Sequence, residues 1–285
     1  MSILVKVHGF LQHPFVKVTL CVLIFCIGAA LSHLAAAFTK LMSPQMPPLP
    51  DIFDILPYYP VLVNVTEIIL SFVLIIGIVT ALAHDQRWTI ISRFCFIAGL
   101  SYAGRAFTCI LTVLPDPAEN NDCHDANSTE SFSRIYLAGA SSFGFQSIKK
   151  GCGDLIYSGH ASITTLATLF TLEYCPKFLQ IWIWTPIWIL TFTVMVLLVA
   201  SRLHYTVDVV LAYYIVSRLF HAYHSELDQR EEDQIPPKRG DFLTCIFWYP
   251  MLRYIEEKPT SWTSCFNKER SSEEPSEVVS LDDDS

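Results

Sequence analysis

The sequence has 285 residues, of which 52% are hydrophobic and only 16% charged, against about 25% charged residues in ordinary globular proteins. Its net charge of −8 lies entirely in residues 224–285, with 15 acidic and 7 basic residues; the 12 acidic and 12 basic residues before them cancel. This distribution excludes a uniformly solvated globule, and it excludes a nucleic-acid-binding protein, which needs a clustered basic face.

Six apolar windows of about 20 residues follow one another along the chain, and about 20 residues of helix cross a hydrocarbon core. The windows are residues 18–39, 61–83, 90–114, 155–172, 181–200 and 207–223. Most lack the polar face that a soluble amphipathic helix shows at a period of 3.6 residues. We therefore predict an all-α, polytopic membrane protein whose six transmembrane helices form one catalytic domain, residues 18–223.

The orientation rests on loop charges and on one sequon. With a cytosolic N-terminus, the segments inside hold six Lys or Arg residues and those outside hold five, which is a weak positive-inside bias. Asn127 begins an Asn-Ser-Thr sequon in the longest loop, which this orientation places in the lumen, although such sequons also arise by chance. We predict cytosolic termini, with 1–17 as an N-terminal segment and 224–285 as an acidic, partly disordered tail.

Four of the nine cysteines fall inside predicted spans as small apolar side chains, so the cysteines do not indicate a disulfide scaffold. No CxxC pair occurs, so they do not indicate a structural zinc site either. Cys123 and Cys152 share the predicted lumenal loop, where both a disulfide and two free thiols are compatible with the sequence. Cys245 and Cys265 lie beside aromatic residues in the tail. They are either acylated, which would hold the tail at the membrane, or exposed thiols.

Ionisable and polar residues gather at one predicted membrane face. They come from the start of the fourth window and from the turn between the fifth and sixth, and they are Asp154, Ser158, His160, Arg202, His204 and Asp208. A charged group at a helix centre raises the free energy of membrane insertion by roughly 2.5–3.5 kcal/mol, so ionisable residues near the spans indicate a structural or functional role. One inward and one outward span separate the two histidines, so we expect them to meet at the lumenal face.

These residue types suit phosphoryl transfer. His204 and Asp208 are four apart, so on a helix they share one face, and the carboxylate can orient the imidazole as a nucleophile. His160 follows Ser158 at a predicted helix start, where free N–H groups suit a phosphate, and an imidazole can donate and take back a proton. Arg202 offers a fork of donors to phosphate oxygens. Each residue alone is also compatible with a capping or interfacial role.

Two further residues have two interpretations each. Arg105 lies in the third window, where it either contacts a lipid headgroup or Glu67, or extends its side chain to the interface. Asp154 either binds a choline cation or caps the fourth helix.

Four segments resemble motifs of the sphingomyelin synthases, within the lipid phosphate phosphatase superfamily. CGDLIYSGH at 152–160 and HYTVDVVLAYY at 204–214 match two specific motifs, while MPPLPDIFD at 46–54 and LPDP at 114–117 match two weaker ones. The order of the motifs is that of the family. Ser201 and Arg202 before His204 also fit the phosphatase signature of the superfamily, so hydrolysis stays an alternative to transfer.

The resemblance implies a membrane-embedded enzyme that moves phosphocholine from phosphatidylcholine to ceramide, without a metal or other cofactor, making sphingomyelin and diacylglycerol. It implies that His204 forms a phosphohistidine, that Asp208 orients it, and that His160 protonates the departing diacylglycerol and then deprotonates ceramide. A Golgi or plasma membrane location with a lumenal or exterior site is expected. Ceramide phosphoethanolamine synthesis, a lipid phosphatase and a non-catalytic lipid-binding protein are the alternatives; a monomer and a homo-oligomer both fit the sequence.

Overall fold

The computed structural model describes residues 14–42, 46–55, 61–117 and 156–233. Within these ranges every regular element is a helix, as predicted. The chain divides into two compact units, Met1–His221 and Ala222–Ser285. All the predicted site residues lie in the first unit, apart from Cys245 and Cys265.

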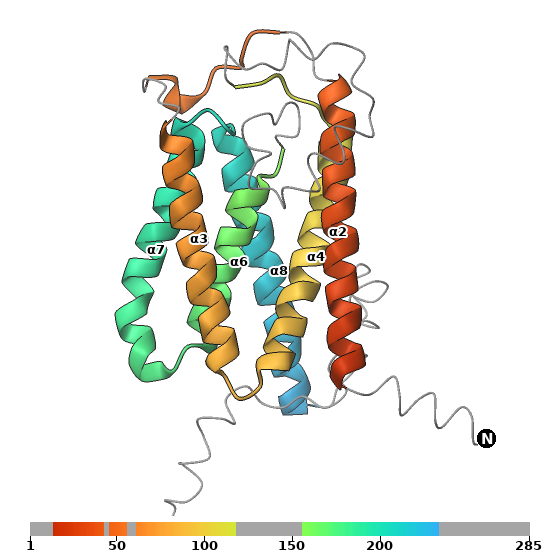
Figure 1. Cartoon of the computed structure of the whole chain (residues 1–285), viewed down its shortest axis with the longest axis vertical. Helices are drawn as coiled ribbons and strands as arrows, with labels where there is room; N and C mark the ends of the chain where they lie inside the picture. The colour runs from red at the N-terminus through yellow and green to blue at the C-terminus, as the bar shows by residue number, and fades with distance from the viewer. Residues whose placement is uncertain (1–13, 43–45, 56–60, 118–155, 234–285) are drawn as a thin grey trace, which may run out of the picture. The chain divides into compact units, whose positions relative to one another are not determined.

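Each of the six apolar windows overlaps one helix, although the third window runs past the helix end at Leu111 and the fourth begins before the helix start at Gly159 (Figure 1). In chain order these are α2 (Pro14–Met42), α3 (Val61–Ala83), α4 (Arg87–Leu111), α6 (Gly159–Tyr174), α7 (Lys177–Ala200) and α8 (Thr206–Asp233), and a short 3₁₀ helix, η1 (Ile52–Ile55), precedes α3. The last helix continues ten residues past the predicted end of the sixth window at Tyr223.

Four of these helices, α2, α3, α4 and α7, are long and apolar enough to cross a membrane. The other two fall short of that description for different reasons. α6 has 16 residues, which is about 24 Å of helix against a hydrocarbon core of about 30 Å, and α8 ends in the charged run 226–233. The structure therefore supports an integral membrane protein, while the six spans and the cytosolic termini stay predictions.

The outward surfaces of these helices agree with a lipid environment. On α3, large apolar side chains that are more than half exposed recur along the whole helix: Val61, Ile68, Phe72, Ile75, Ile78, Val79 and Leu82. A soluble protein rarely leaves so continuous an apolar surface uncovered. The hydrocarbon core of a bilayer is the environment in which this surface is stable.

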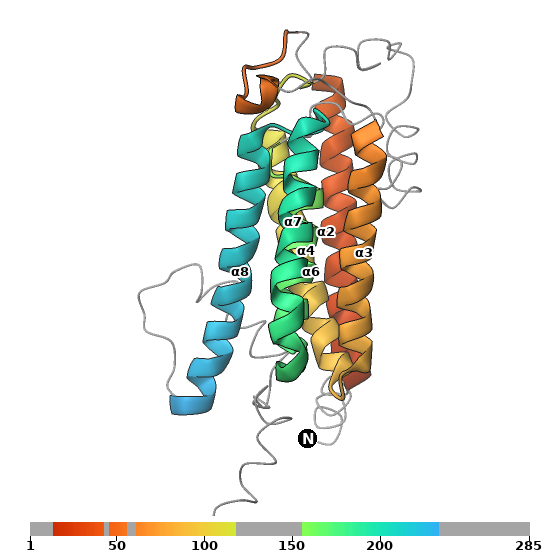
Figure 2. The same ribbon diagram turned by 90° about the vertical axis from the view of Figure 1, so that its left-hand side faces the viewer.

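Helices α2 and α4 pack along most of their length because two glycines meet at their crossing (Figures 1 and 2). A Cβ atom on Gly99 would lie 2.9 Å from backbone atoms of Ile24 and Phe25, and one on Gly28 would overlap the Gly99 carbonyl. Glycine is therefore required on both helices for the backbones to approach this closely.

Helix α6 is buried by its neighbours α3, α4 and α7. Its buried polar positions are Ser162 and several threonines, and their hydroxyls form hydrogen bonds within the protein. Thr165 and Thr171 donate to carbonyl oxygens four residues earlier, at 2.7 Å each, and the Thr168 hydroxyl lies 2.6 Å from that of Thr191 on α7. This burial places the start of α6 in the interior of the bundle, where the predicted site begins.

Candidate active site

The structure brings the two predicted histidines together. His160 lies at the first turn of α6 and His204 in the turn before α8, and their ring centroids are 6.4 Å apart. The α6–α7 hairpin therefore returns the chain to the same end of the bundle, as the sequence predicts.

His204 and Asp208 form a buried pair. Their side chains are 8% and 0% exposed, and His204 Nδ1 lies 3.8 Å from Asp208 Oδ2, just beyond hydrogen-bond length. Within the described residues, His204 Nδ1 and Asp208 Oδ1 have no hydrogen-bond partner. Buried polar atoms are nearly always paired, so these two atoms are exceptions within the described residues; the other carboxylate oxygen, Oδ2, accepts the Tyr205 N–H at 2.9 Å. Nδ1 faces the carboxylate, which leaves Nε2 for chemistry.

Ser158 ties the two histidine-bearing segments to each other. Its side-chain oxygen caps α6 by accepting the Ala161 N–H at 3.3 Å, and its own N–H donates to the backbone carbonyl of Asp208 at 3.2 Å. Ser158 is fully buried. The structure thus gives it a capping role, and the predicted contact of Ser158 with a phosphate stays a prediction.

Two residues that precede the site residues have left-handed backbone conformations. Tyr157 has φ of 71° and Arg202 has φ of 54°, although neither is glycine. Such conformations cost on the order of 1–3 kcal/mol and persist only where the surroundings hold them. Tyr157 is held by a hydrogen bond between its hydroxyl and that of Ser101 on α4.

Arg105 also holds the Tyr157 turn from inside the bundle. It is only 8% exposed, its Nε donates to the Tyr157 carbonyl at 3.0 Å, and its Nη1 donates to the Ser32 hydroxyl on α2 at 2.6 Å. Its guanidinium also lies against Gly159, where a Cβ atom would be 3.3 Å from Nε. Arg105 therefore supports the start of α6, and a further contact with a lipid headgroup stays a prediction.

Arg202 lies beside the site and forms an ion pair with the Asp54 carboxylate in the segment that follows α2. Its second terminal nitrogen donates to the Asp54 carbonyl at 3.2 Å. This pair leaves the predicted role of Arg202 toward phosphate open, because a guanidinium has five N–H donors. The remaining predicted residues lie outside the described part of the chain: Asp154, Asn127, Cys123, Cys152, Cys245 and Cys265.

Sequence reasoning missed Asp51, which lies at the same end of the bundle. Both of its carboxylate oxygens accept hydrogen bonds from Thr206, the first residue of α8, at 2.8 and 2.6 Å. Burial alone would raise the pKa of Asp51, but the hydrogen bonds from Thr206 and Phe53 and the nearby Arg202 outweigh it and lower that pKa. The only sequence signal was the motif at 46–54, which by itself indicates no role.

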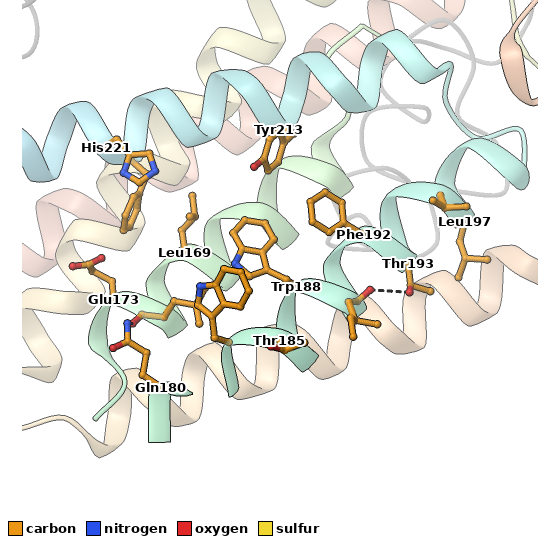
Figure 3. Close-up of a pocket in the computed structure, with 15 residues that line it drawn as sticks. Leu169, Glu173, Gln180, Thr185, Trp188, Phe192, Thr193, Leu197, Tyr213 and His221 are labelled. Atoms are coloured by element: carbon orange, nitrogen blue, oxygen red, sulfur yellow. Dashed lines mark hydrogen bonds between the residues drawn. The ribbon is translucent and has the colours of Figure 1, made fainter. Parts of the chain in front are cut away.

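An apolar groove of about 1010 Å³ lies between α6, α7 and α8 (Figure 3). Trp188 and Phe192 on α7 face Tyr213 on α8, each with ring centroids 6.2 Å from that of the tyrosine. At one end the groove reaches Leu197, whose carbonyl accepts the N–H of Ser201 at the turn leading to His204. Glu173, Gln180 and His221 lie at the other end. The groove follows α7 from Gln180 to Leu197, which is about 25 Å of helix.

Comparison with known proteins places these residues in a family. The model of the PAP2 superfamily C-terminal family matches residues 151–225, which contain both histidines and Asp208. The chain is 32% identical over 249 residues to phosphatidylcholine:ceramide cholinephosphotransferase 1 of Caenorhabditis elegans, covering 84% of this chain and 52% of that protein.

Two human proteins show similar agreement. Sphingomyelin synthase-related protein 1 is 30% identical over 214 residues, covering 74% of this chain and 50% of its own length. Phosphatidylcholine:ceramide cholinephosphotransferase 2 is 30% identical over 226 residues, covering 77% and 60%. The chain thus spans about half the length of the curated relatives it matches. From its motifs, the superfamily match and these relatives, the chain belongs to the sphingomyelin synthase family of the PAP2 superfamily.

Proposed function

We propose that this protein transfers phosphocholine from phosphatidylcholine to the primary hydroxyl of ceramide, releasing diacylglycerol and forming sphingomyelin. The observation that carries the proposal is the pair of histidine rings 6.4 Å apart, with the buried Asp208 carboxylate beside one of them. Two of the relatives above are named as phosphatidylcholine:ceramide cholinephosphotransferases, which supports the choice of donor and acceptor.

The first step uses His204 as the nucleophile. Its Nε2 attacks phosphorus, the bond from phosphorus to the diacylglycerol oxygen breaks, and His160 gives that oxygen a proton. Asp208 stabilises the positive charge on the phosphorylated imidazole, and its burial makes this interaction stronger than it would be in water. The products of this step are free diacylglycerol and a phosphocholine group bound to His204.

The second step reverses these roles with ceramide. The neutral His160 takes the proton of the ceramide hydroxyl, the ceramide oxygen attacks phosphorus, and the bond from phosphorus to His204 Nε2 breaks. His160 ends protonated and His204 neutral, which restores the starting state. One site thereby serves two bulky lipids in turn, because diacylglycerol leaves from, and ceramide attacks at, the same face of the phosphoryl group, opposite His204.

The groove supports lipids as the substrates. It is walled by aromatic and aliphatic side chains within the apolar part of the bundle, and it ends at Leu197, beside the turn that carries His204. A substrate whose phosphate lies between the histidines can therefore place an acyl chain along α7. We further propose that the site faces the lumen of the Golgi or the cell exterior, in a six-span protein with cytosolic termini.

The test is headgroup transfer in liposomes containing the full chain. Fluorescent ceramide is supplied with phosphatidylcholine or phosphatidylethanolamine, and the lipid products are separated. We expect a choline-headgroup product from the wild type and none from His204→Ala or His160→Ala. His84→Ala is the matched control, because His84 lies in the turn between α3 and α4 and should not affect transfer.

Three outcomes would contradict the proposal. Unchanged product from His204→Ala would exclude this histidine as the nucleophile. Product from phosphatidylethanolamine alone would show a ceramide phosphoethanolamine synthase, and release of free phosphocholine without ceramide turnover would show a hydrolase.

A second experiment uses phosphatidylcholine that carries a labelled phosphorus atom. We expect the label to become bound to the wild-type protein through an acid-labile bond, and we expect no bound label in His204→Ala.

A further inference from the structure

One distant segment, residues 46–55, binds both ends of the turn that carries His204 through hydrogen bonds and an ion pair. Asp51 lies 155 positions before Thr206, yet it accepts both the N–H and the hydroxyl of that residue. The first N–H groups of a helix have no partner within the helix, and a short polar side chain just before the helix usually supplies one. Here that position is Tyr205, whose side chain is engaged elsewhere, so Asp51 caps α8 instead.

Asp54 fastens the other side of the turn. Its carboxylate pairs with Arg202, the residue in the left-handed conformation two positions before His204. The other oxygen of the same carboxylate accepts the N–H of Asp51 at 2.6 Å. The Asp54 carboxylate is thus bound to the Asp51 backbone, and the two carboxylates contact the turn at residues 202 and 206.

Tyr205 forms a third set of contacts that hold the turn. Its hydroxyl accepts the N–H of Leu49 at 3.0 Å and donates to the Pro115 carbonyl at 3.1 Å, so the turn is joined to the segment after α4 as well. Its N–H donates to Asp208 Oδ2 at 2.9 Å, which completes the reciprocal half of a capping box. Arg202, Tyr205 and Thr206 are therefore each held through a long-range or capping contact, and the Leu203 N–H donates to the Leu198 carbonyl at 3.2 Å.

The position of the His204 ring depends on this backbone, since its Nδ1 has no hydrogen-bond partner within the described residues. We propose that Asp51, with Asp54, is a positioning residue that holds the 202–206 turn so that His204 faces His160. The proposal rests on the proposed function, in which His204 is the nucleophile. The motif at 46–54 then serves to align the nucleophile without touching the lipid.

The test compares two changes at Asp51 with a matched control. Asp51→Ala removes both acceptors, and a shift of the nucleophile by about 1 Å can lower a rate about 100-fold, so we expect kcat to fall about 10- to 100-fold with KM nearly unchanged. Asp51→Asn can accept the Thr206 N–H and donate to its hydroxyl, and it gives up only the acceptor for the Phe53 N–H, so it should restore kcat to within about threefold of wild type. Asp85→Ala removes an exposed carboxylate from the α3–α4 turn and should change nothing.

A milder variant keeps the test decisive if Asp51→Ala does not fold. Thr206→Val retains the N–H bond to Asp51 and removes only the hydroxyl bond at 2.6 Å. The residue stays helical and similar in size, so the helix should form. We expect a smaller fall of kcat, about 3- to 10-fold, again with KM nearly unchanged, because one of the two contacts remains.

A second readout needs no substrate. Hydrogen exchange of the backbone amides at 205–207 should quicken about tenfold or more in Asp51→Ala and stay near wild type in Asp51→Asn, because the capping acceptor is lost only in the first. If the wild type transfers no headgroup but these amides respond, the proposed function fails while the capping contact stands. The positioning role is overturned if Asp51→Ala keeps wild-type kcat, if KM alone changes, or if Asp51→Asn is as impaired as Asp51→Ala.

Discussion

The contact between α2 and α4 allows a quantitative test with two glycines of one helix. Gly99 and Gly104 both lie in α4, so replacing either with alanine brings the same gain in helix propensity, about 1 kcal/mol. Only Gly99 meets a rigid obstacle, since its Cβ would lie 2.9 Å from the backbone of Ile24 and Phe25. The Cβ of Gly104 would lie 3.8 Å from the Tyr157 ring, an ordinary contact distance.

The propensity gain cancels when the two variants are compared, which leaves the overpacking cost of about 1–3 kcal/mol at Gly99. At about 2–4 °C per kcal/mol for a domain of this size, Gly99→Ala should melt about 2–12 °C below Gly104→Ala. The measurement is thermal unfolding of the two variants in the same detergent, followed by the loss of monodisperse protein. A Gly99→Ala variant that melts at or above Gly104→Ala would refute the argument from close backbone approach.

Three other predictions concern the groove, the loop carboxylate and the buried threonines. Val196→Trp fills the groove and should raise KM for long-chain lipid substrates more than for short-chain analogues, whereas Val79→Trp on the outer face of α3 should change neither; equal effects on both chain lengths would count against the groove. The pKa of Asp51 is lowered below its usual 3.8, so the ionised Asp51 contributes fully to stability above that pH, and the contribution is lost as the pH falls through the lower folded-state pKa. The melting temperature should therefore fall less between pH 5 and pH 2 in Asp51→Asn than in the wild type. Thr168→Val removes the hydroxyl pair with Thr191 and should lower the unfolding free energy by about 0.6 kcal/mol, measured by denaturant titration, with no change expected if the pair is not formed.

The helices were predictable because each membrane helix is an almost continuous run of apolar residues in the sequence. Each of the six windows overlaps a helix. The i, i+4 spacing of His204 and Asp208 was argued for two residues on one helix, whereas the structure places His204 in the turn before α8, with its Nδ1 3.8 Å from the Asp208 carboxylate. The meeting of His160 with His204 followed from counting spans, since each helix reverses the direction of the chain. These inferences use only local pattern and topology, which the order of residues contains directly.

The contacts that hold the site were not predictable in the same way. Arg202 was predicted to contact phosphate from its charge, and that role stays a prediction; what the sequence did not indicate is its ion pair with Asp54, 148 positions earlier. Arg105 was expected to reach a headgroup, Glu67 or the interface, and the structure shows it bound to Ser32 and to the Tyr157 carbonyl. Such pairs depend on which loops meet after folding, and no spacing rule in a single sequence encodes a partner so far away.

The capping of α8 by Asp51 also has a consequence for biosynthesis. Asp51 follows the first long helix, whereas Thr206 begins the last, so the ribosome makes 155 further residues before the two can meet. Until the last helix has entered the bundle, the His204 turn has neither its cap nor its opposing histidine in place. Under the proposed function, a nascent chain therefore cannot complete its site until the last helix has joined the bundle.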